Sequence, residues 1–144
     1  TPNFPVHVGQ VVSFRATLIG RYQTKPQISA AADWIQHTDE APFVGGSAGP
    51  NADVFLWEPD REMTRLDANR LIRVTGQLDG PGNTCGSRNR CWNLNYGFGD
   101  PLILRTSHER AETGSCVTFV GPLGVFRGNL QLDTTNLDWI SVYE

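Results

Sequence analysis

The chain has 144 residues, the size of one ordinary domain, and a formal net charge of −3 at pH 7. This charge argues against a protein that coats polyanions by net charge alone, and no apolar run approaches the ~18 residues that a membrane-spanning helix requires. The 15 Gly and 9 Pro residues supply turns at the density of an all-β protein, so residues 1–144 are predicted to form a single β domain with no membrane-spanning segment.

Alternation of apolar and polar residues is the strongest local signal. It runs through three stretches that share the same order of apolar and small residues, and each is predicted to be a strand with one buried face. Each stretch is followed by a candidate partner strand, and one more alternating segment closes the chain. The three stretches are residues 12–18, 72–78 and 117–123, their partners are 53–57, 91–96 and 129–133, and the last segment is 137–143.

Helical content is predicted to be small. Residues 26–36 contain an alanine-rich run and are predicted to form a short helix. Residues 59–69 are predicted to form a second one, because Asp60 offers a cap ahead of apolar residues at helical spacing. Long Gly-rich or polar stretches at 38–52, 79–90 and 105–114 are predicted loops.

The alternation also predicts which side chains fill the core. Residues two apart on a strand share a face, so the apolar phase of each stretch should point inward. The predicted core consists of Val12, Phe14, Leu18, Val54, Leu56, Ile72, Val74, Leu78, Leu94, Val117, Phe119, Leu130, Leu132 and Ile140. Cys116, at the start of the third stretch, is predicted to be buried with them.

The segments Gly114–Leu123 and Arg127–Leu132 resemble the last two strands of OB-folds of the replication protein A type. In these, a valine-x-apolar-x-glycine strand leads through a hairpin to a leucine-x-leucine return. Asn69–Leu78 looks like the same element again, so the resemblance implies an elaborated five-strand pattern. The predicted fold class is all-β, a small antiparallel barrel with one or two short helices. A jelly roll, another β-sandwich, or a β-trefoil built on the three hairpin-like units are the alternatives.

Residues 88–98 interleave two arginines with three aromatic and three asparagine side chains. Single-stranded nucleic acids are held in this way, because bases stack on aromatic rings while Arg meets phosphate. Alternatively, Trp92, Leu94 and Tyr96 share one strand face and fill the core. A sugar ring is a further possible ligand, because Trp and Tyr stack on sugar rings while Asn binds hydroxyl groups. The OB resemblance adds the first strand to the binding face. The predicted ligand-binding residues are Arg15, Arg21, Tyr22, Trp57, Arg73, Arg88, Arg90, Trp92, Tyr96 and Phe98.

The three cysteines bear on the compartment. Cys85 and Cys91 flank a five-residue segment and are predicted to be bridged, with Cys116 free, if the chain is extracellular. Three free thiols would favour an intracellular protein. No CxxC is present and the three histidines are scattered, so the sequence argues against a zinc site.

Catalytic constellations are weak in this sequence. Ser107 and His108 are adjacent in a predicted loop without a GxSxG elbow, and the paired carboxylates lie near turns, where such residues are usually caps. We therefore predict a non-catalytic module without a cofactor, which binds single-stranded nucleic acid or docks in a protein assembly. The alternative is an extracellular domain that recognises carbohydrate or protein. The localisation and the oligomeric state stay open.

Overall fold

The structure is a computed structural model, and it describes residues 10–40, 43–44, 47–48, 56–134 and 137–143. Strands make up most of this part of the chain, which confirms the all-β prediction. Its helical content is two short 3-10 turns. One, η2, lies within residues 59–69, where a longer helix was predicted, and the other, η3, replaces the first part of the strand predicted at 137–143. These turns span Arg65–Asp67 and Leu137–Trp139.

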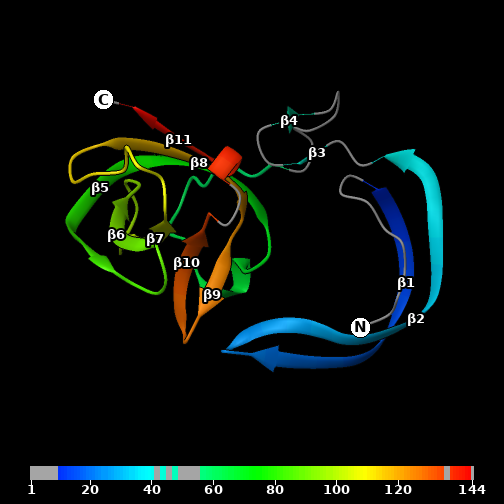
Figure 1. Cartoon of the computed structure of the whole chain (residues 1–144). Helices are drawn as coiled ribbons and strands as arrows, with labels where there is room; N and C mark the ends of the chain where they lie inside the picture. The colour runs from blue at the N-terminus through cyan, green and yellow to red at the C-terminus, as the bar shows by residue number, and fades with distance from the viewer. Residues whose placement is uncertain (1–9, 41–42, 45–46, 49–55, 135–136, 144) are drawn as a thin grey trace.

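Seven strands form one curled sheet in the order β11-β8-β5-β6-β7-β10-β9, a half-barrel (Figure 1). Neighbouring strands are antiparallel except β10, which runs parallel to β7. The sheet is therefore mixed rather than purely antiparallel. After β7 the chain crosses to the other side of β5, where it forms β8, and it then returns to pair with β7 as β10. The strands are β5 (Leu71–Thr84), β6 (Arg90–Asn95), β7 (Leu102–Thr106), β8 (Cys116–Pro122), β9 (Gly124–Phe126), β10 (Asn129–Asp133) and β11 (Ile140–Tyr143).

Of the three predicted strand pairs, the second forms as expected, the third does not, and most of the partner in the first lies outside the described residues. β5 and β6 are antiparallel, with Leu78 opposite Leu94, and β5 continues through residues that were predicted to be a loop. The third pair was wrong, because β10 pairs with β9 rather than with β8. Pro122 has no N–H to extend the ladder, and the next N–H, that of Leu123, donates to Arg70 O. Leu123 thus still bonds to the segment before β5, and the separate short strand β9 forms the hairpin with β10.

The core lies inside the curl of the sheet and is built from alternate residues of its strands. Eight of the predicted core residues are buried there: Ile72, Val74, Leu78, Leu94, Val117, Phe119, Leu132 and Ile140. Leu56 and Leu130 are partly buried, and Val54 lies outside the described residues. Cys116 is exposed, contrary to prediction, because the outward phase of β8 begins with it. The prediction also missed Met63, Trp92, Tyr96, Leu102, Leu104, Ala111, Leu123 and Val125.

The remaining long strands form an arm, which we define as β1 (Gln10–Tyr22) and β2 (Lys25–Glu40). They pair with each other in an antiparallel two-stranded sheet that stands beside the curled sheet (Figure 1). The helix predicted at 26–36 was wrong, because this segment follows a tight turn and pairs along β1. Of the partner predicted for β1 at 53–57, residues 53–55 lie outside the described residues, and Trp57 does not pair with β1. Instead, Trp57 forms an isolated parallel bridge with Ile72.

The arm explains three errors in the predicted core. Val12, Phe14 and Leu18 alternate as the residues of a half-buried strand do, yet Phe14 is 39% and Leu18 57% exposed, and Val12 is only partly buried. A two-stranded sheet has no second layer to cover its faces, so alternation alone does not bury them. Between the arm and Trp57, two further short strands pair with each other, β3 (Phe43–Val44) and β4 (Ser47–Ala48).

Candidate functional site

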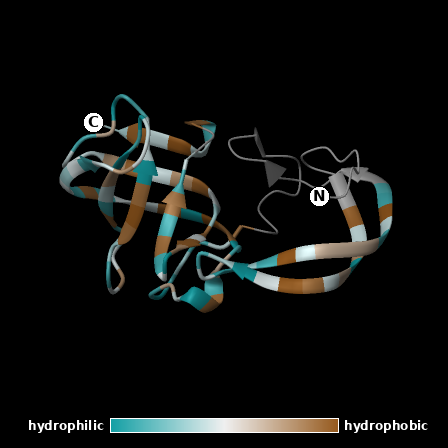
Figure 2. Cartoon of the chain, turned by 60° about the horizontal axis from the view of Figure 1, so that its bottom comes forward, coloured by the Kyte–Doolittle hydropathy of each residue, from teal (hydrophilic) through white to brown (hydrophobic). Residues whose placement is uncertain are grey.

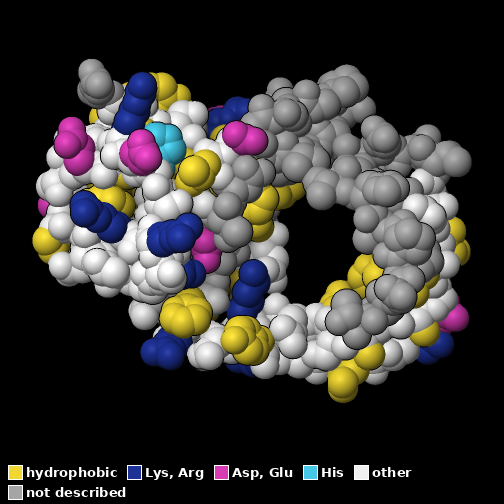
Figure 3. All heavy atoms as spheres, in the orientation of Figure 1, with side chains coloured by type: hydrophobic (Ala, Val, Ile, Leu, Met, Phe, Trp, Pro, Cys, Tyr) yellow, Lys and Arg dark blue, Asp and Glu magenta, His cyan; other side chains and the backbone are white. Residues whose placement is uncertain are grey.

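The arm exposes large apolar side chains along both of its strands. In β1, Leu18, Ile19 and Tyr22 are 57%, 74% and 65% exposed, and Ile28 and Ile35 of β2 are more than half exposed. Figure 2 shows hydrophobic residues spread along both strands, and Figure 3 shows hydrophobic side chains at the surface of the arm. Large hydrophobic side chains that are exposed together, rather than singly, mark interaction surfaces or aggregation hazards.

The turn of the arm contacts the turn between β9 and β10. The Arg127 N–H donates to Gln23 O at 3.0 Å, and the Gly128 N–H donates to Thr24 Oγ1 at 2.6 Å. All four residues have positive φ, with 50° at Gln23 and 71° at Thr24. Each turn therefore has the positive-φ geometry of a tight hairpin turn, and the two turns contact each other at their tips. The arm extends away from this contact (Figure 1).

Side-chain contacts join the two strands of the arm to each other. They use polar groups that would otherwise be available to a ligand, and Arg15 is one of the predicted binding residues. These contacts are an Arg15–Asp33 ion pair at 2.7 Å, a Ser13–His37 hydrogen bond at 2.8 Å and a Phe14–Trp34 ring contact at 4.7 Å.

A disulfide closes the loop between β5 and β6. Cys85 and Cys91 are bridged, with their Cα atoms 5.8 Å apart, and Cys116 is a free, exposed thiol. Inside the loop, the Cys85 N–H donates to Asn89 O, and the Asn89 side chain donates to Ser87 O. Arg88 adopts a positive φ of 63° at the tip. The bridge and these bonds give the loop a defined shape.

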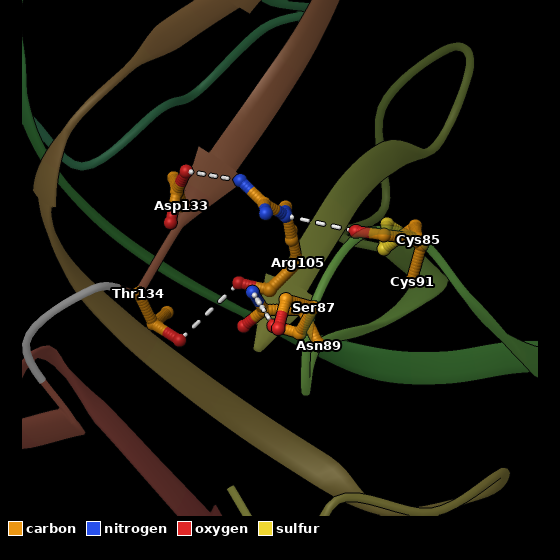
Figure 4. Close-up of a disulfide and its surroundings, with 7 residues drawn as sticks. All are labelled: Cys85, Ser87, Asn89, Cys91, Arg105, Asp133 and Thr134. Carbon is orange, nitrogen blue, oxygen red and sulfur yellow. Dashed lines mark hydrogen bonds and ion pairs between the residues drawn. A yellow bond between two sulfur atoms is a disulfide. The ribbon is translucent and has the colours of Figure 1, made fainter. Parts of the chain in front are cut away.

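Arg105 of β7 fastens the disulfide loop to the sheet. Its Nε donates to Cys85 O at 3.1 Å, and its Nη1 lies 3.2 Å from Asp133 Oδ2 on β10. Its own carbonyl oxygen accepts two hydrogen bonds from Thr134. Figure 4 shows this chain of contacts from the disulfide through Arg105 to β10. Arg105 therefore has a positioning role that the sequence did not indicate.

Beside this loop lies a pocket of about 300 Å³, which we call the disulfide-loop pocket. Two arginines, Arg88 and Arg90, line it together with residues that follow β7. Its complete lining is Arg88, Arg90, Trp92, Thr106, Ser107, His108, Glu109 and Ala111. Within the part of the chain that the structure describes, neither arginine has an ion-pair partner.

The loop after β7 is held by hydrogen bonds of its own. The His108 N–H donates to Thr106 Oγ1 at 3.1 Å, and the Ala111 N–H donates to His108 O at 3.2 Å. The Arg110 N–H lies 3.2 Å from Nδ1 of His108 and donates to it. A neutral His108 ring then carries its proton on Nε2, which leaves that nitrogen as a donor. The sequence placed these residues in a loop, and only the adjacent Ser107 and His108 drew attention to it.

Two predicted binding residues lie at another edge of the molecule. The guanidinium carbons of Arg61 and Arg70 lie 4.8 Å and 3.8 Å from the ring centre of Trp57. The Arg73 guanidinium contacts Glu58 at 3.0 Å. Trp57 and Arg73 therefore contribute to local packing and ion pairing.

The aromatic residues of β6 and its end are mostly buried. Trp92 is 4% and Tyr96 9% exposed, and the Tyr96 hydroxyl accepts a hydrogen bond from the Met63 N–H. Their rings belong to the core and are not open for stacking on bases. Phe98 is 38% exposed and lies 6.0 Å from the Tyr96 ring. The predicted residues are thus divided among the arm, the Trp57 edge and β6 with the disulfide loop, rather than gathered in one groove.

A buried carboxylate organises the segment beside Trp57. Asp67 accepts two hydrogen bonds from Arg61, one from the Thr64 N–H and one from Arg70. The side chain of Arg61, the Thr64 backbone and Arg70 outweigh the effect of burial and hold the pKa of Asp67 far below its usual value. The same contact raises the pKa of Arg61.

Comparison with family models, curated proteins and solved structures gives no match for this chain. Among the described residues, no cluster of three or more His, Cys, Asp or Glu is placed to hold a metal ion. The helical turns in the same residues are too short to cross a membrane.

Proposed function

We propose that this chain is a non-catalytic binding module that docks in a protein assembly through its arm, and that the docking partner is the arm of a second copy. The supporting observation is that five large apolar side chains on a two-stranded sheet are each more than half exposed. An isolated pair of strands is marginally stable in water, so further strands would stabilise the arm.

The free edge of β1 is the surface on which a strand would add. Among the described strands, β1 pairs only with β2, and none of the others hydrogen-bonds to its other edge. Natural edge strands are usually short or protected by proline and inward charges. The 13 residues of β1 contain no proline, and their only charged side chains are Arg15 and Arg21. This long edge therefore lacks two of the usual protections against pairing, proline and a high density of charge, although its pairing with β2 shifts register at four points.

The sequence of β1 suits pairing with itself. In an antiparallel pair centred on Ala16, Phe14 of one copy lies opposite Leu18 of the other. Arg15 then lies opposite Thr17, so no two like charges face each other. Apolar cross-strand pairs each contribute about 0.2–1 kcal/mol, and directly opposed like charges are destabilising. A two-fold symmetric pair of this kind is the commonest form of homo-oligomer.

We also propose that the curled sheet is of the OB type, and its strand order supports this. Five consecutive members of the sheet, β8-β5-β6-β7-β10, have the order expected of a five-stranded, partly open Greek-key barrel, in which the long strand β5 pairs on both sides. The single-stranded nucleic acid function has less support, because Trp92 and Tyr96 are buried and do not offer stacking surfaces.

The experiment is light scattering coupled to size-exclusion chromatography over a range of protein concentrations. We expect a dimer that dissociates on dilution. Thr17→Lys places a second positive charge opposite Arg15 and should shift the protein to monomer, whereas Thr17→Glu should preserve or strengthen the dimer. Thr17 is exposed, so both variants should fold. A monomer at all concentrations would refute the proposal, as would equal association of the two variants.

A matched control tests the apolar contribution. Leu18→Lys should weaken association, because it removes the residue opposite Phe14. Leu137→Lys makes the same change at a side chain that is 42% exposed on η3, outside the arm, and should leave association unchanged. Equal effects of the two changes would show that association does not use the arm.

A further inference from the structure

The geometry points to the disulfide-loop pocket as a binding site for a saccharide that carries a sulfate or phosphate group. This site is separate from the arm and does not depend on the docking proposal. Its volume of about 300 Å³ lies at the lower end of the range for small-molecule pockets, roughly 300–1,000 Å³. A pocket of this size takes one ring with its substituents rather than a length of polymer.

The anionic group is assigned from the two arginines. Arg88 and Arg90 reach the same pocket from the loop and from the first residue of β6, and neither has an ion-pair partner among the described residues. Guanidinium groups bind oxyanions such as phosphate with paired, charge-assisted hydrogen bonds. The disulfide and the Arg105 contacts hold the backbone of this loop before any ligand arrives.

The saccharide is assigned from other residues of the pocket lining. Ser107 offers a hydroxyl, and the His108 ring, whose Nδ1 accepts from the Arg110 N–H, offers its Nε2–H as a donor. Glu109 is a carboxylate in the same lining, and it accepts hydrogen bonds from hydroxyl groups. Glu109 would repel a second anionic group, which disfavours a polyanionic strand. A ligand with one oxyanion and several hydroxyls satisfies both sets of lining residues.

The disulfide agrees with this ligand class. Disulfides persist in oxidising compartments outside the cytosol, where a glycan is a more available ligand than single-stranded nucleic acid. The net charge of −3 also disfavours binding that depends on a polyanionic backbone.

The test is a titration followed by NMR and by calorimetry, with N-acetylglucosamine 6-sulfate and N-acetylglucosamine 6-phosphate as probes. The matched ligands are neutral N-acetylglucosamine, inorganic sulfate, inorganic phosphate and a dT oligonucleotide. We expect both charged sugars to bind more tightly than the neutral sugar and than either inorganic ion, and to shift the indole N–H signal of Trp92, which lines the pocket. The tighter of the two identifies the anionic group.

Variants place the binding in the pocket. Arg88→Gln and Arg90→Gln should each weaken the charged sugars about tenfold, the value of one charge-assisted contact at a partly solvated site. Arg65→Gln removes the same charge from η2, outside this pocket, and should leave the affinity unchanged. Ser107→Ala should weaken the neutral sugar as well as the charged ones.

Several results would overturn the inference. Inorganic sulfate or phosphate bound as tightly as the sugars would show an anion site without a saccharide. An oligonucleotide bound more tightly than either sugar would favour nucleic acid instead. Absence of binding by every probe, or an equal loss in the Arg65 control, would remove the pocket from consideration. Any of these results leaves the association experiment on the arm unaffected, so the two proposals fail separately.

Discussion

The Nη1 and Nη2 atoms of Arg61 donate hydrogen bonds to the two carboxylate oxygens of Asp67 at 2.9 Å and 2.8 Å, and the Asp67 side chain is only 6% exposed. Replacing Asp67 by Asn removes the buried negative charge that Arg61 and Arg70 pair with, and it puts an amide NH2 group where one carboxylate oxygen accepts a hydrogen bond. We expect a loss of about 2–3 kcal/mol in the free energy of unfolding, measured by urea denaturation. Asp100→Asn, at an exposed position, should change it by no more than about 0.5 kcal/mol. Equal effects of the two changes would contradict the role given to Asp67.

The same carboxylate predicts a pH dependence. The folded-state pKa of Asp67 lies far below the value of about 3.9 that an unfolded chain gives it, so the unfolded state takes up a proton first as the pH falls. The stability from Asp67 is therefore complete above that value and is lost progressively below it. The gap in unfolding free energy between the wild type and Asp67→Asn should shrink as the pH falls below about 4. A gap that is constant with pH would contradict this sign.

Gly82 and Trp92 give a prediction about packing. A Cβ atom on Gly82 would come within 2.6 Å of the Trp92 ring, and the backbone there has a φ of +63°. Gly82→Ala should therefore destabilise the fold by about 2–4 kcal/mol, from overpacking and backbone strain together. Gly97→Ala provides the control, because Gly97 also has positive φ but nothing within 4 Å of its added Cβ. It should cost only the backbone part, about 1–2 kcal/mol. Equal losses would show that Trp92 can move aside.

Part of the curled sheet was predictable from the sequence, because β5, β6 and β8 obey simple alternation and pack around one core, whereas β7 and β9 were not predicted. Val74 and Phe119, for example, were both expected in the core and both are buried. The arm was not predictable in this way, since Phe14 and Leu18 show the same alternation without a layer to cover them. Local patterns report which residues share a face, but they do not report whether a second layer exists.

The candidate site illustrates the same limit. Arg88 and Arg90 could be chosen from composition, and they line the pocket. Other residues of the pocket lining come from the loop after β7. Arg105, which positions the disulfide loop, is distant from that loop in the sequence. Their meeting depends on the antiparallel pairing of β6 with β7, which puts Arg90 opposite Thr106. Trp92 was misjudged as a stacking surface because a strand residue gives no sign of which face the sheet covers.

The disulfide predicts a distinct labelling pattern. In the native protein without reductant, an alkylating reagent should modify one thiol, that of exposed Cys116, and after reduction and unfolding it should modify three. Intact mass reads both states. Replacing Cys85 and Cys91 together by Ser should lower the unfolding free energy by roughly 2 kcal/mol, the value for a short closed loop. Three modified thiols in the unreduced native protein would show that the bridge is absent.

The attachment of the arm predicts a local effect at one amide. The Gly128 N–H donates to Thr24 Oγ1, and Thr24 holds a φ of 71° that costs energy for a β-branched residue. Thr24→Val keeps the branched shape and the backbone strain but removes the hydroxyl, which accepts from the Gly128 N–H and donates to Gln23 O, so the comparison isolates the contacts of this hydroxyl. A bond of about 1 kcal/mol corresponds to roughly fivefold faster hydrogen exchange at Gly128. Thr24→Ser keeps the hydroxyl and should retain the protection. Unchanged exchange at Gly128 in Thr24→Val, measured by NMR, would mean that this contact does not hold the arm against the curled sheet in solution.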